Sequence, residues 1–258
     1  MTMLDGRIVL VTGAAGGIGR SSVESFLGYG AKVVGFDLHP AADWAELRGR
    51  DNFLGLQGDH CNQEDVAKAY VAAQAAFGRV DGLYCNAGKG YAGDYSAIDT
   101  PALEAAFANH VSGAYNMVQG FLSQYDLGAE TSAAPAAIVF TSSRLGHKAR
   151  PNMVQYAVAK HGLQGLMRSL AEDLGPRGIR VNAVCPGMVA TDVARDMVEA
   201  YAKDGNTDAV FARLAAEYPL RRLTEAKDVA EAAAFLLSSR AKAIHATSLA
   251  VDCGVHGF

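Results

Sequence analysis

Short runs of apolar residues recur along the whole chain, and longer segments with helical spacing separate them. We expect strands over residues 7–11, 31–36, 53–57, 81–85, 136–140, 179–184 and 248–252. Most of these runs lack the polar and apolar alternation that is typical of a strand with one wet face. Strands that are apolar on both faces need helices on both sides, so the pattern predicts seven parallel strands between two helical layers.

The helical segments between the strands are marked by their start and stop residues. Residues 63–78 follow Asn62, a residue type that caps helix N-termini, and end with a glycine. Residues 154–175 also end with a glycine, and a proline follows it. The pattern is weakest over 126–135 and 191–218.

Composition narrows the class of protein. The chain has 258 residues, of which 50% are hydrophobic and 19% charged, so it can bury a sizeable core. No linker or low-complexity tract divides it. We therefore expect an α/β protein with a single Rossmann-like, doubly wound domain over residues 1–258.

The charge and the cysteine positions argue against nucleic acid, membranes and metal ions as partners. The formal net charge of -4 gives no general attraction to nucleic acid or to an anionic membrane. No apolar run approaches the ~18 residues of a membrane span, and no secretory signal is visible. The four cysteines are far apart, without a CxxC pair or a histidine at metal-ligand spacing. We expect reduced, buried thiols, no metal site, a cytoplasmic location and a small-molecule partner.

The segment VTGAAGGIGR at residues 11–20 places small residues between an apolar run and the start of a helix. Gly13, Gly17 and Gly19 permit a tight turn and let backbone amides approach a phosphate, while a helix N-terminus offers N–H groups and a positive dipole end. This arrangement suits a nucleotide pyrophosphate. A glycine-rich turn that only packs a helix against a sheet is the alternative.

Asp37 ends the second predicted strand, 18 positions after Gly19. A carboxylate there can accept hydrogen bonds from an adenosine ribose and would repel the additional phosphate of NADP. No Lys or Arg lies between Gly13 and Gly19 or directly beside Asp37. The sequence therefore favours NAD over NADP, with an ordinary strand-end aspartate as the alternative.

Tyr156 and Lys160 are four positions apart in a strongly helical segment, so their side chains share one face. A nearby ammonium favours the phenolate and brings the tyrosine pKa from ~10 toward the range that is useful for proton transfer. The pair is thus a candidate proton donor and acceptor. A helix-surface pair without a catalytic role is the alternative.

Several motifs resemble, in order and spacing, those of the short-chain dehydrogenase/reductase family. They are TGAAGGIG at 12–19, NAG at 86–88, Asn109, Ser143, YAVAK at 156–160 and PG at 186–187. The resemblance runs to VDCG at 251–254 and covers nearly the whole chain. It implies a seven-stranded parallel sheet and a homotetramer or homodimer.

The resemblance also implies roles for individual residues. Ser143 would hold the substrate oxygen, Lys160 would bind the nicotinamide ribose, and Asn109 would position a water that connects Lys160 to solvent. Asp59 would meet the adenine ring, although His60-Cys61 is an unusual continuation, and Thr191 would bond the carboxamide. The residues implied for dinucleotide binding are Gly13, Gly17, Ile18, Gly19, Asp37, Asp59, Asn86, Ala87, Gly88, Tyr156, Lys160, Pro186, Gly187, Val189 and Thr191.

We therefore expect an NAD-dependent alcohol dehydrogenase or ketone reductase. In oxidation, the Tyr156 phenolate would accept the alcohol proton as hydride leaves the carbinol carbon for the nicotinamide. One alternative is an NADPH-dependent carbonyl or 3-oxoacyl-thioester reductase, which Asp37 opposes. Another is a non-catalytic dinucleotide-sensing protein, which the Ser143, Tyr156 and Lys160 set opposes.

Positive charge is dense near Ser143. Arg144 follows it directly, Lys89 follows the NAG motif, and the stretch before Tyr156 adds His147, Lys148 and Arg150. These groups can hold an anionic substrate, since arginine suits two-point binding of an oxyanion. A solvated loop or a set of subunit salt bridges is the favoured alternative, because exposed charges are common.

Two further features border the expected site. We expect the segment around 191–218 to form one or two helices that cover the substrate. His110 and His161 each follow a proposed catalytic residue, but neighbours along a helix point in different directions, so neither is given a role.

Overall fold

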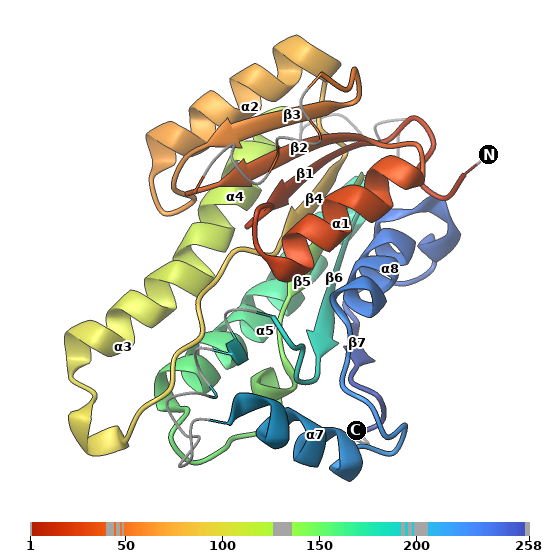
Figure 1. Cartoon of the computed structure of the whole chain (residues 1–258). Coiled ribbons are helices and arrows are strands. Elements are labelled where there is room, and N and C mark those ends of the chain that lie inside the picture. Colours follow the sequence, from red (N-terminus) through yellow and green to blue (C-terminus); the bar gives the residue numbers. More distant parts are fainter. Residues whose placement is uncertain are drawn as a thin grey trace.

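The computed structural model describes residues 2–39, 44, 47, 49–125, 136–191, 194, 195, 198 and 206–255. Within that part of the chain, a sheet of seven strands forms the centre (Figure 1). The strands are β1 (Ile8–Thr12), β2 (Lys32–Asp37), β3 (Phe53–Gln57), β4 (Gly82–Cys85), β5 (Ala136–Thr141), β6 (Ile179–Pro186) and β7 (Ser248–Val251).

The strand order is β3-β2-β1-β4-β5-β6-β7, and all the pairings are parallel. This order confirms the predicted Rossmann-like class, and the predicted strand bounds lie within two residues of the observed ones. The direction of winding reverses between β1 and β4. In open parallel sheets, ligands bind at the carboxyl ends of the strands at such a reversal.

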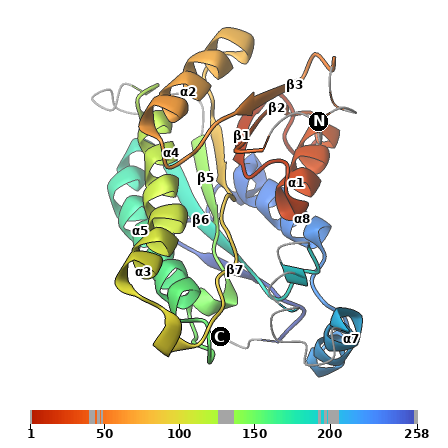
Figure 2. The ribbon, with the colours of Figure 1, turned by 60° about the vertical axis from the view of Figure 1, so that its left-hand side comes forward.

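Helices cover both faces of the sheet (Figure 2). On one face lie α1 (Gly17–Gly28) and α8 (Ala226–Leu237), and on the other lie α2 (Gln63–Phe77), α4 (Gly113–Leu122) and α5 (Val154–Leu174). The chain also forms α3 (Thr100–Phe107) and α7 (Thr207–Glu217), the latter beyond the carboxyl end of β6 in Figure 1.

The core consists of two apolar layers, one on each side of the sheet. Successive strand residues point to opposite faces, so Leu10 packs in one layer while its neighbours Val9 and Val11 pack in the other. Both layers exclude water, with Met117 fully buried on the α4 side and Phe26 on the α1 side. This double burial explains why the strands carry no polar alternation.

The helix boundaries follow local capping chemistry. The Asn62 side chain accepts hydrogen bonds from the backbone N–H groups of Glu64 (2.9 Å) and Asp65 (3.3 Å), which confirms the predicted start of α2. Helix α5 ends at Leu174, and a short 3-10 turn follows at Gly175–Arg177.

Two sequence expectations fall partly outside the described residues. Residues 126–135, and within 191–218 residues 192, 193, 196, 197 and 199–205, are not described. Helix α7 confirms a helix in the second segment. Among the described residues, no helix combines the length and the apolar character that crossing a membrane requires.

All four cysteines are free thiols. Cys85, Cys185 and Cys253 are buried as expected, but Cys61 is exposed. The expectation was wrong for Cys61 because it lies in the loop between β3 and α2 rather than in a covered strand.

Candidate active site

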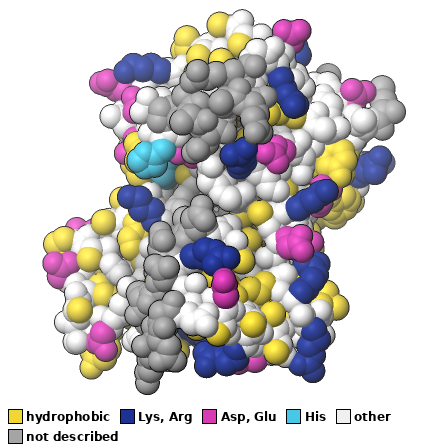
Figure 3. Space-filling view, in the orientation of Figure 1, with side chains coloured by type: hydrophobic (Ala, Val, Ile, Leu, Met, Phe, Trp, Pro, Cys, Tyr) yellow, Lys and Arg dark blue, Asp and Glu magenta, His cyan; other side chains and the backbone are white. Residues whose placement is uncertain are grey.

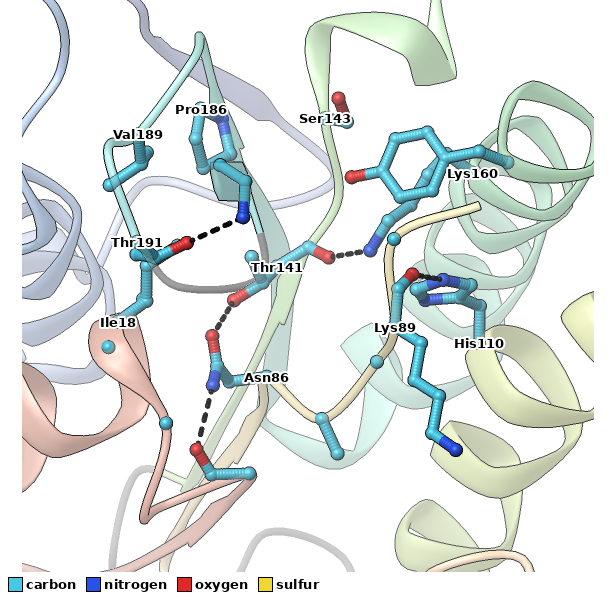
Figure 4. A pocket seen from close by; sticks show the side chains of 18 of the residues that line it. Ile18, Asn86, Lys89, His110, Thr141, Ser143, Lys160, Pro186, Val189 and Thr191 are labelled. Carbon is cyan, nitrogen blue, oxygen red and sulfur yellow. Dashed lines mark hydrogen bonds between the residues drawn. The ribbon is translucent and has the colours of Figure 1, made fainter. Parts of the chain in front are cut away.

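A cavity of about 960 Å³ receives side chains from the carboxyl ends of the strands and the loops that follow them. The residues predicted to have a catalytic or coenzyme role all line it, except Gly19. Of the basic residues considered for an anionic substrate, Lys89, Arg144 and Arg150 line it, whereas His147 and Lys148 do not. Figure 4 shows Ile18 and Thr191 on one side, Lys160 and His110 on the other, and Thr141 and Asn86 between them.

The glycine loop (residues 13–19) fits closely under two other segments. Gly13 has φ +63°, and a Cβ atom there would lie 2.8 Å from Ala87 Cα. A Cβ atom on Gly17 would lie 2.5 Å from Thr191 Cγ2. Both positions therefore require glycine, and the bare backbone that results faces the cavity.

Gly19 has a different role from the one expected. It does not line the cavity, because α1 has already begun at Gly17 and Gly19 faces the turn behind it. A Cβ atom at Gly19 would lie 1.9 Å from the Gly13 carbonyl oxygen. The residue thus sets how closely α1 approaches the turn after β1.

The N-terminus of α1 has the properties of an anion site. It has no side-chain cap and no acidic residue in its first turn, and Gly16, Gly17 and Ile18 line the cavity. The unpaired N–H groups and the positive dipole end are therefore available to a phosphate group. The residues present fit the pyrophosphate of a dinucleotide.

Asp37 is fixed at the end of β2 by two backbone groups. Its Oδ2 accepts a hydrogen bond from Ala15 N (2.9 Å), and its Oδ1 accepts one from His39 N (3.0 Å). A carboxylate has further lone pairs, so Asp37 can still accept hydrogen bonds from a ribose in the cavity that it lines.

Hydrogen bonds tie the ends of β1, β4 and β5 together beneath the cavity. Asn86 N and Ala87 N both donate to Thr12 Oγ1 at 3.0 Å. Thr141 Oγ1 donates to Asn86 Oδ1 (3.1 Å). The side-chain nitrogen of Asn86 in turn donates to the Thr12 carbonyl oxygen (3.2 Å). This network holds the NAG turn (residues 86–88) against the glycine loop (Figure 4).

Ser143, Tyr156 and Lys160 meet in the same cavity, as predicted. The Lys160 ammonium group lies 5.5 Å from the centre of the Tyr156 ring and donates to the Thr141 carbonyl oxygen at 2.8 Å. The Ser143 side chain lies near the Tyr156 phenol and lowers its pKa. The end of β5 and one face of α5 thus supply a hydroxyl, a phenol and an amine.

The pKa values of this group differ from the expectation. Burial raises the pKa of Tyr156, and the nearby Ser143 side chain opposes that rise. Burial lowers the pKa of Lys160 to about 7. The predicted lowering of the Tyr156 pKa by Lys160 was wrong, because burial destabilises both charged forms and the group that favours the phenolate is Ser143. At neutral pH, Tyr156 is a phenol with a proton to give.

His110 also belongs to the site, against the expectation that it points elsewhere. It lies in a π-helical turn, Ala108–Ser112, and its ring centre is 5.5 Å from that of Tyr156 in an edge-to-face contact. Its Nε2 donates to the Lys89 carbonyl oxygen at 2.8 Å. Burial holds the pKa of His110 well below its usual value, so the ring is neutral. His161 instead bonds the Ala157 carbonyl oxygen of its own helix and does not line the cavity.

Asn109 is held by two hydrogen bonds, and the sequence analysis predicted neither of them. Its Oδ1 accepts a hydrogen bond from Lys89 N (2.9 Å), and its carbonyl oxygen accepts one from His60 Nε2 (2.7 Å). His60 thus connects the loop after β3 to the π-helical turn. A carbonyl oxygen has two lone pairs, so this contact leaves room for one more donor.

Asp59, His60 and Cys61 offer ligand atoms that lie within 4.8 Å of one another, the one such group of three among the described residues. Burial raises the pKa of the Cys61 thiol to about 11. His60 Nε2 is already occupied by the Asn109 carbonyl group. These contacts favour a supporting role for the loop over a metal site.

The opposite end of the cavity is basic. Arg144 and Arg150 line it as predicted, and Arg213 joins them. Lys89 also lines the cavity, but its charge acts on the Cys61 thiol, so it lies toward the loop that follows β3. Sequence analysis gave Arg213 no role, because it lies on α7, in the segment with the weakest pattern.

Comparisons with known proteins agree with this geometry. A family model described as enoyl-(acyl carrier protein) reductase matches residues 13–256. The 2,5-dichloro-2,5-cyclohexadiene-1,4-diol dehydrogenase of Sphingobium indicum is 31% identical over 257 residues, which span 98% of each chain.

Two solved structures are similar over almost their whole length. An oxidoreductase of the short chain dehydrogenase/reductase family from Burkholderia thailandensis is 32% identical, with a TM-score of 0.84 over 96% of this chain and 92% of that one. An actinorhodin polyketide ketoreductase solved with NADPH is 27% identical, with a TM-score of 0.91 and coverage of 100% of both chains.

Proposed function

The chain belongs to the short-chain dehydrogenase/reductase family, and on that premise we propose that it transfers hydride between NAD(H) and a secondary alcohol or the corresponding ketone. The observation that carries the proposal is the meeting of Ser143, Tyr156 and Lys160 in one cavity with the glycine loop. A protein that only senses a dinucleotide has no need of a buried phenol and amine beside the Ser143 hydroxyl.

The proposed coenzyme is NAD. The dinucleotide supplies the hydride acceptor or donor when it is bound. Gly13, Gly16 and Gly17 would face its pyrophosphate, and Lys160 would bond the nicotinamide ribose. Asp37 supports NAD over NADP, because its fixed carboxylate would repel a phosphate on the adenosine ribose. The actinorhodin ketoreductase was solved with NADPH, so an NADPH-dependent carbonyl or thioester reductase is the rival within the family.

The proposed chemistry of the protein takes place at the substrate oxygen. Ser143 would hold that oxygen, and in reduction the Tyr156 hydroxyl group would give it a proton as hydride reaches the carbonyl carbon. In oxidation the Tyr156 phenolate would take the alcohol proton. Lys160, with a pKa of about 7, can hold or release a proton at Nζ near neutral pH and so can exchange protons with the Tyr156 oxygen. Asn109 would support this exchange through a water.

The family also guides three coarser proposals. We propose that residues 1–258 act as one coenzyme-binding domain, that the protein assembles as a homotetramer or homodimer, and that it works in the cytoplasm. Sedimentation at several protein concentrations tests the assembly.

Replacement of Tyr156 by Phe tests the proposed reaction. It should lower the turnover number by about 10²–10⁴-fold, the range that is typical for loss of a general acid–base group, while NADH still binds. Tyr115→Phe is the matched control, because Tyr115 is exposed and does not line the cavity. Turnover by Tyr156→Phe close to that of the control would contradict the mechanism.

Affinities for NADH and NADPH, measured side by side on the wild-type protein, test the choice of coenzyme. Tighter binding of NADH supports NAD. Tighter binding of NADPH would favour the rival reductase and leave the roles of Tyr156 and Lys160 intact.

A further inference from the structure

Charge is distributed unevenly along the cavity. Among its described lining residues, the carboxylates are Asp37, the last residue of β2, and Asp59, which follows β3. Both lie at the end that we assign to the adenosine. The opposite end carries three arginines, Arg144, Arg150 and Arg213, and no carboxylate among the described lining residues. The end at which the substrate would lie is therefore positively charged.

The three arginines come from different parts of the fold. Arg144 follows Ser143 in a short 3-10 turn, and Arg150 precedes α5. Arg213 lies on α7, where it lines the cavity together with Val210 and Leu214. Residues three and four positions apart share one helix face, so that face of α7 presents one guanidinium group beside two apolar side chains. Figure 3 shows Lys and Arg side chains on the lower part of the molecule, where α7 lies.

Other arginines nearby already have partners. Arg195 forms a salt bridge with Asp208 at 2.9 Å and lies over the Phe211 ring. The side chains of Arg144, Arg150 and Arg213, in contrast, form no ion pair or hydrogen bond with any described residue. Arg144 is half-buried, so water compensates its charge less fully than that of a free surface arginine.

A second hollow of about 210 Å³ adjoins the cavity and shares Arg144, Arg150 and Leu214 with it. It adds Lys148 and one acidic residue, Glu217. Glu217 is four positions after Arg213 on α7 but forms no salt bridge with it or with any other described residue. With three cations and one carboxylate, this hollow is also net positive.

We propose that the substrate carries an oxyanion, a carboxylate or a phosphate, that Arg144, Arg150 and Arg213 bind while its ketone or alcohol group lies at Ser143 and Tyr156. This inference rests on the proposed function and narrows its substrate class. Guanidinium groups match both oxyanions, since their N–H groups bond two oxygens at once. Val210 and Leu214 would contact the carbon skeleton between the two polar ends.

The test compares three ketones with the same carbon skeleton, ending in a carboxylate, a phosphate monoester or a neutral carboxamide. With NADH as reductant, the wild-type kcat/KM should be about tenfold or more higher for at least one anionic ketone than for the carboxamide, since hydrogen bonds to charged groups contribute about 1.5–3 kcal/mol. The carboxylate and phosphate arms identify which oxyanion is preferred.

Arg213→Gln and Arg150→Gln should each lower kcat/KM for the preferred anionic ketone about tenfold. The kcat/KM for the carboxamide ketone should stay nearly unchanged. Both residues are exposed, so the fold should tolerate the changes. Lys227→Gln is the control, because Lys227 is exposed on α8 and lines neither hollow. Arg213→Glu should reverse the preference in favour of the carboxamide.

Equal kcat/KM for the three ketones, or equal losses on all of them in the arginine variants, would overturn the oxyanion site while leaving the proposed function intact. Absence of turnover with every ketone would instead contradict the proposed function. In that case calorimetric titration of the NADH-saturated protein with the keto acid decides the inference. Binding that Arg213→Gln weakens supports the oxyanion site, and absence of binding overturns it.

Discussion

The two ends of the cavity are built in different ways. At the coenzyme end, bare backbone is closely packed: a Cβ atom on Gly13 would collide with the Ala87 backbone, and one on Gly17 with the Thr191 side chain. At the substrate end, the lining consists of long side chains from separate loops and from α7. Close packing of backbone restricts residue type at fixed spacing, whereas side chains on exposed elements can change without altering the fold. The residue types at the coenzyme end are therefore more tightly restricted than those at the substrate end.

Of the changes that separate the two ends, Gly19→Ala should have the largest effect, and that effect should be confined to coenzyme binding. Its Cβ would lie 1.9 Å from the Gly13 carbonyl oxygen, so the glycine loop must move. Overpacking of this kind costs about 1–3 kcal/mol. If that free energy must be supplied when the glycine loop takes the shape that binds NADH, the NADH affinity falls by roughly 5–150-fold. Calorimetric titration with NADH measures the loss.

Gly28→Ala is the matched control for that change, since Gly28 ends the same helix and a Cβ there would meet nothing within 4 Å. Its NADH affinity should equal that of the wild type. If Gly19→Ala binds NADH as well as Gly28→Ala does, the close packing at this end does not shape the coenzyme site.

The pH dependence of kcat/KM tests the role of Tyr156, which lies between the two ends of the cavity. Burial raises the pKa of Tyr156, so below that pKa the phenolate fraction grows about tenfold with each pH unit. The kcat/KM for alcohol oxidation, which needs the phenolate, should therefore rise with pH from about 6 to about 9, and that for ketone reduction, which needs the phenol, should not. A bell-shaped or flat oxidation profile would assign the proton transfer to another group.

Asp37→Asn should have a smaller effect, confined to the choice of coenzyme. The amide oxygen can still accept a hydrogen bond from Ala15 N, but the negative charge that repels a phosphate is gone. The ratio of NADPH to NADH affinity should rise by about tenfold, the value of one charged hydrogen bond. The preference among ketones should stay the same, and a change in it would show that the two ends are not independent.

The features predicted correctly from the sequence are those that a local pattern determines. The run at 53–57 gave β3 because strands covered on both faces must be apolar, and the spacing of Tyr156 and Lys160 placed both in the cavity because they share one helix. His110 was misplaced because a π-helical turn widens the backbone, and no side-chain pattern indicates such a turn.

Other properties depend on tertiary contacts that a sequence does not contain. The direction of the Tyr156 pKa shift depends on how deeply the ring is buried, and burial outweighs the lowering by Ser143. Arg213 lines the cavity because the tertiary fold places α7 beside it. His60, in the loop after β3, contacts Asn109 in a π-helical turn that is far away along the chain.

The most direct test of the central claim follows the hydride itself. A secondary alcohol labelled with deuterium at the carbinol carbon is incubated with the protein and NAD, and the reduced coenzyme is analysed by mass spectrometry. The account predicts one deuterium in each NADH formed and no label in water. Deuterium that appears in water instead of NADH, or oxidation of the alcohol without formation of NADH, would contradict it.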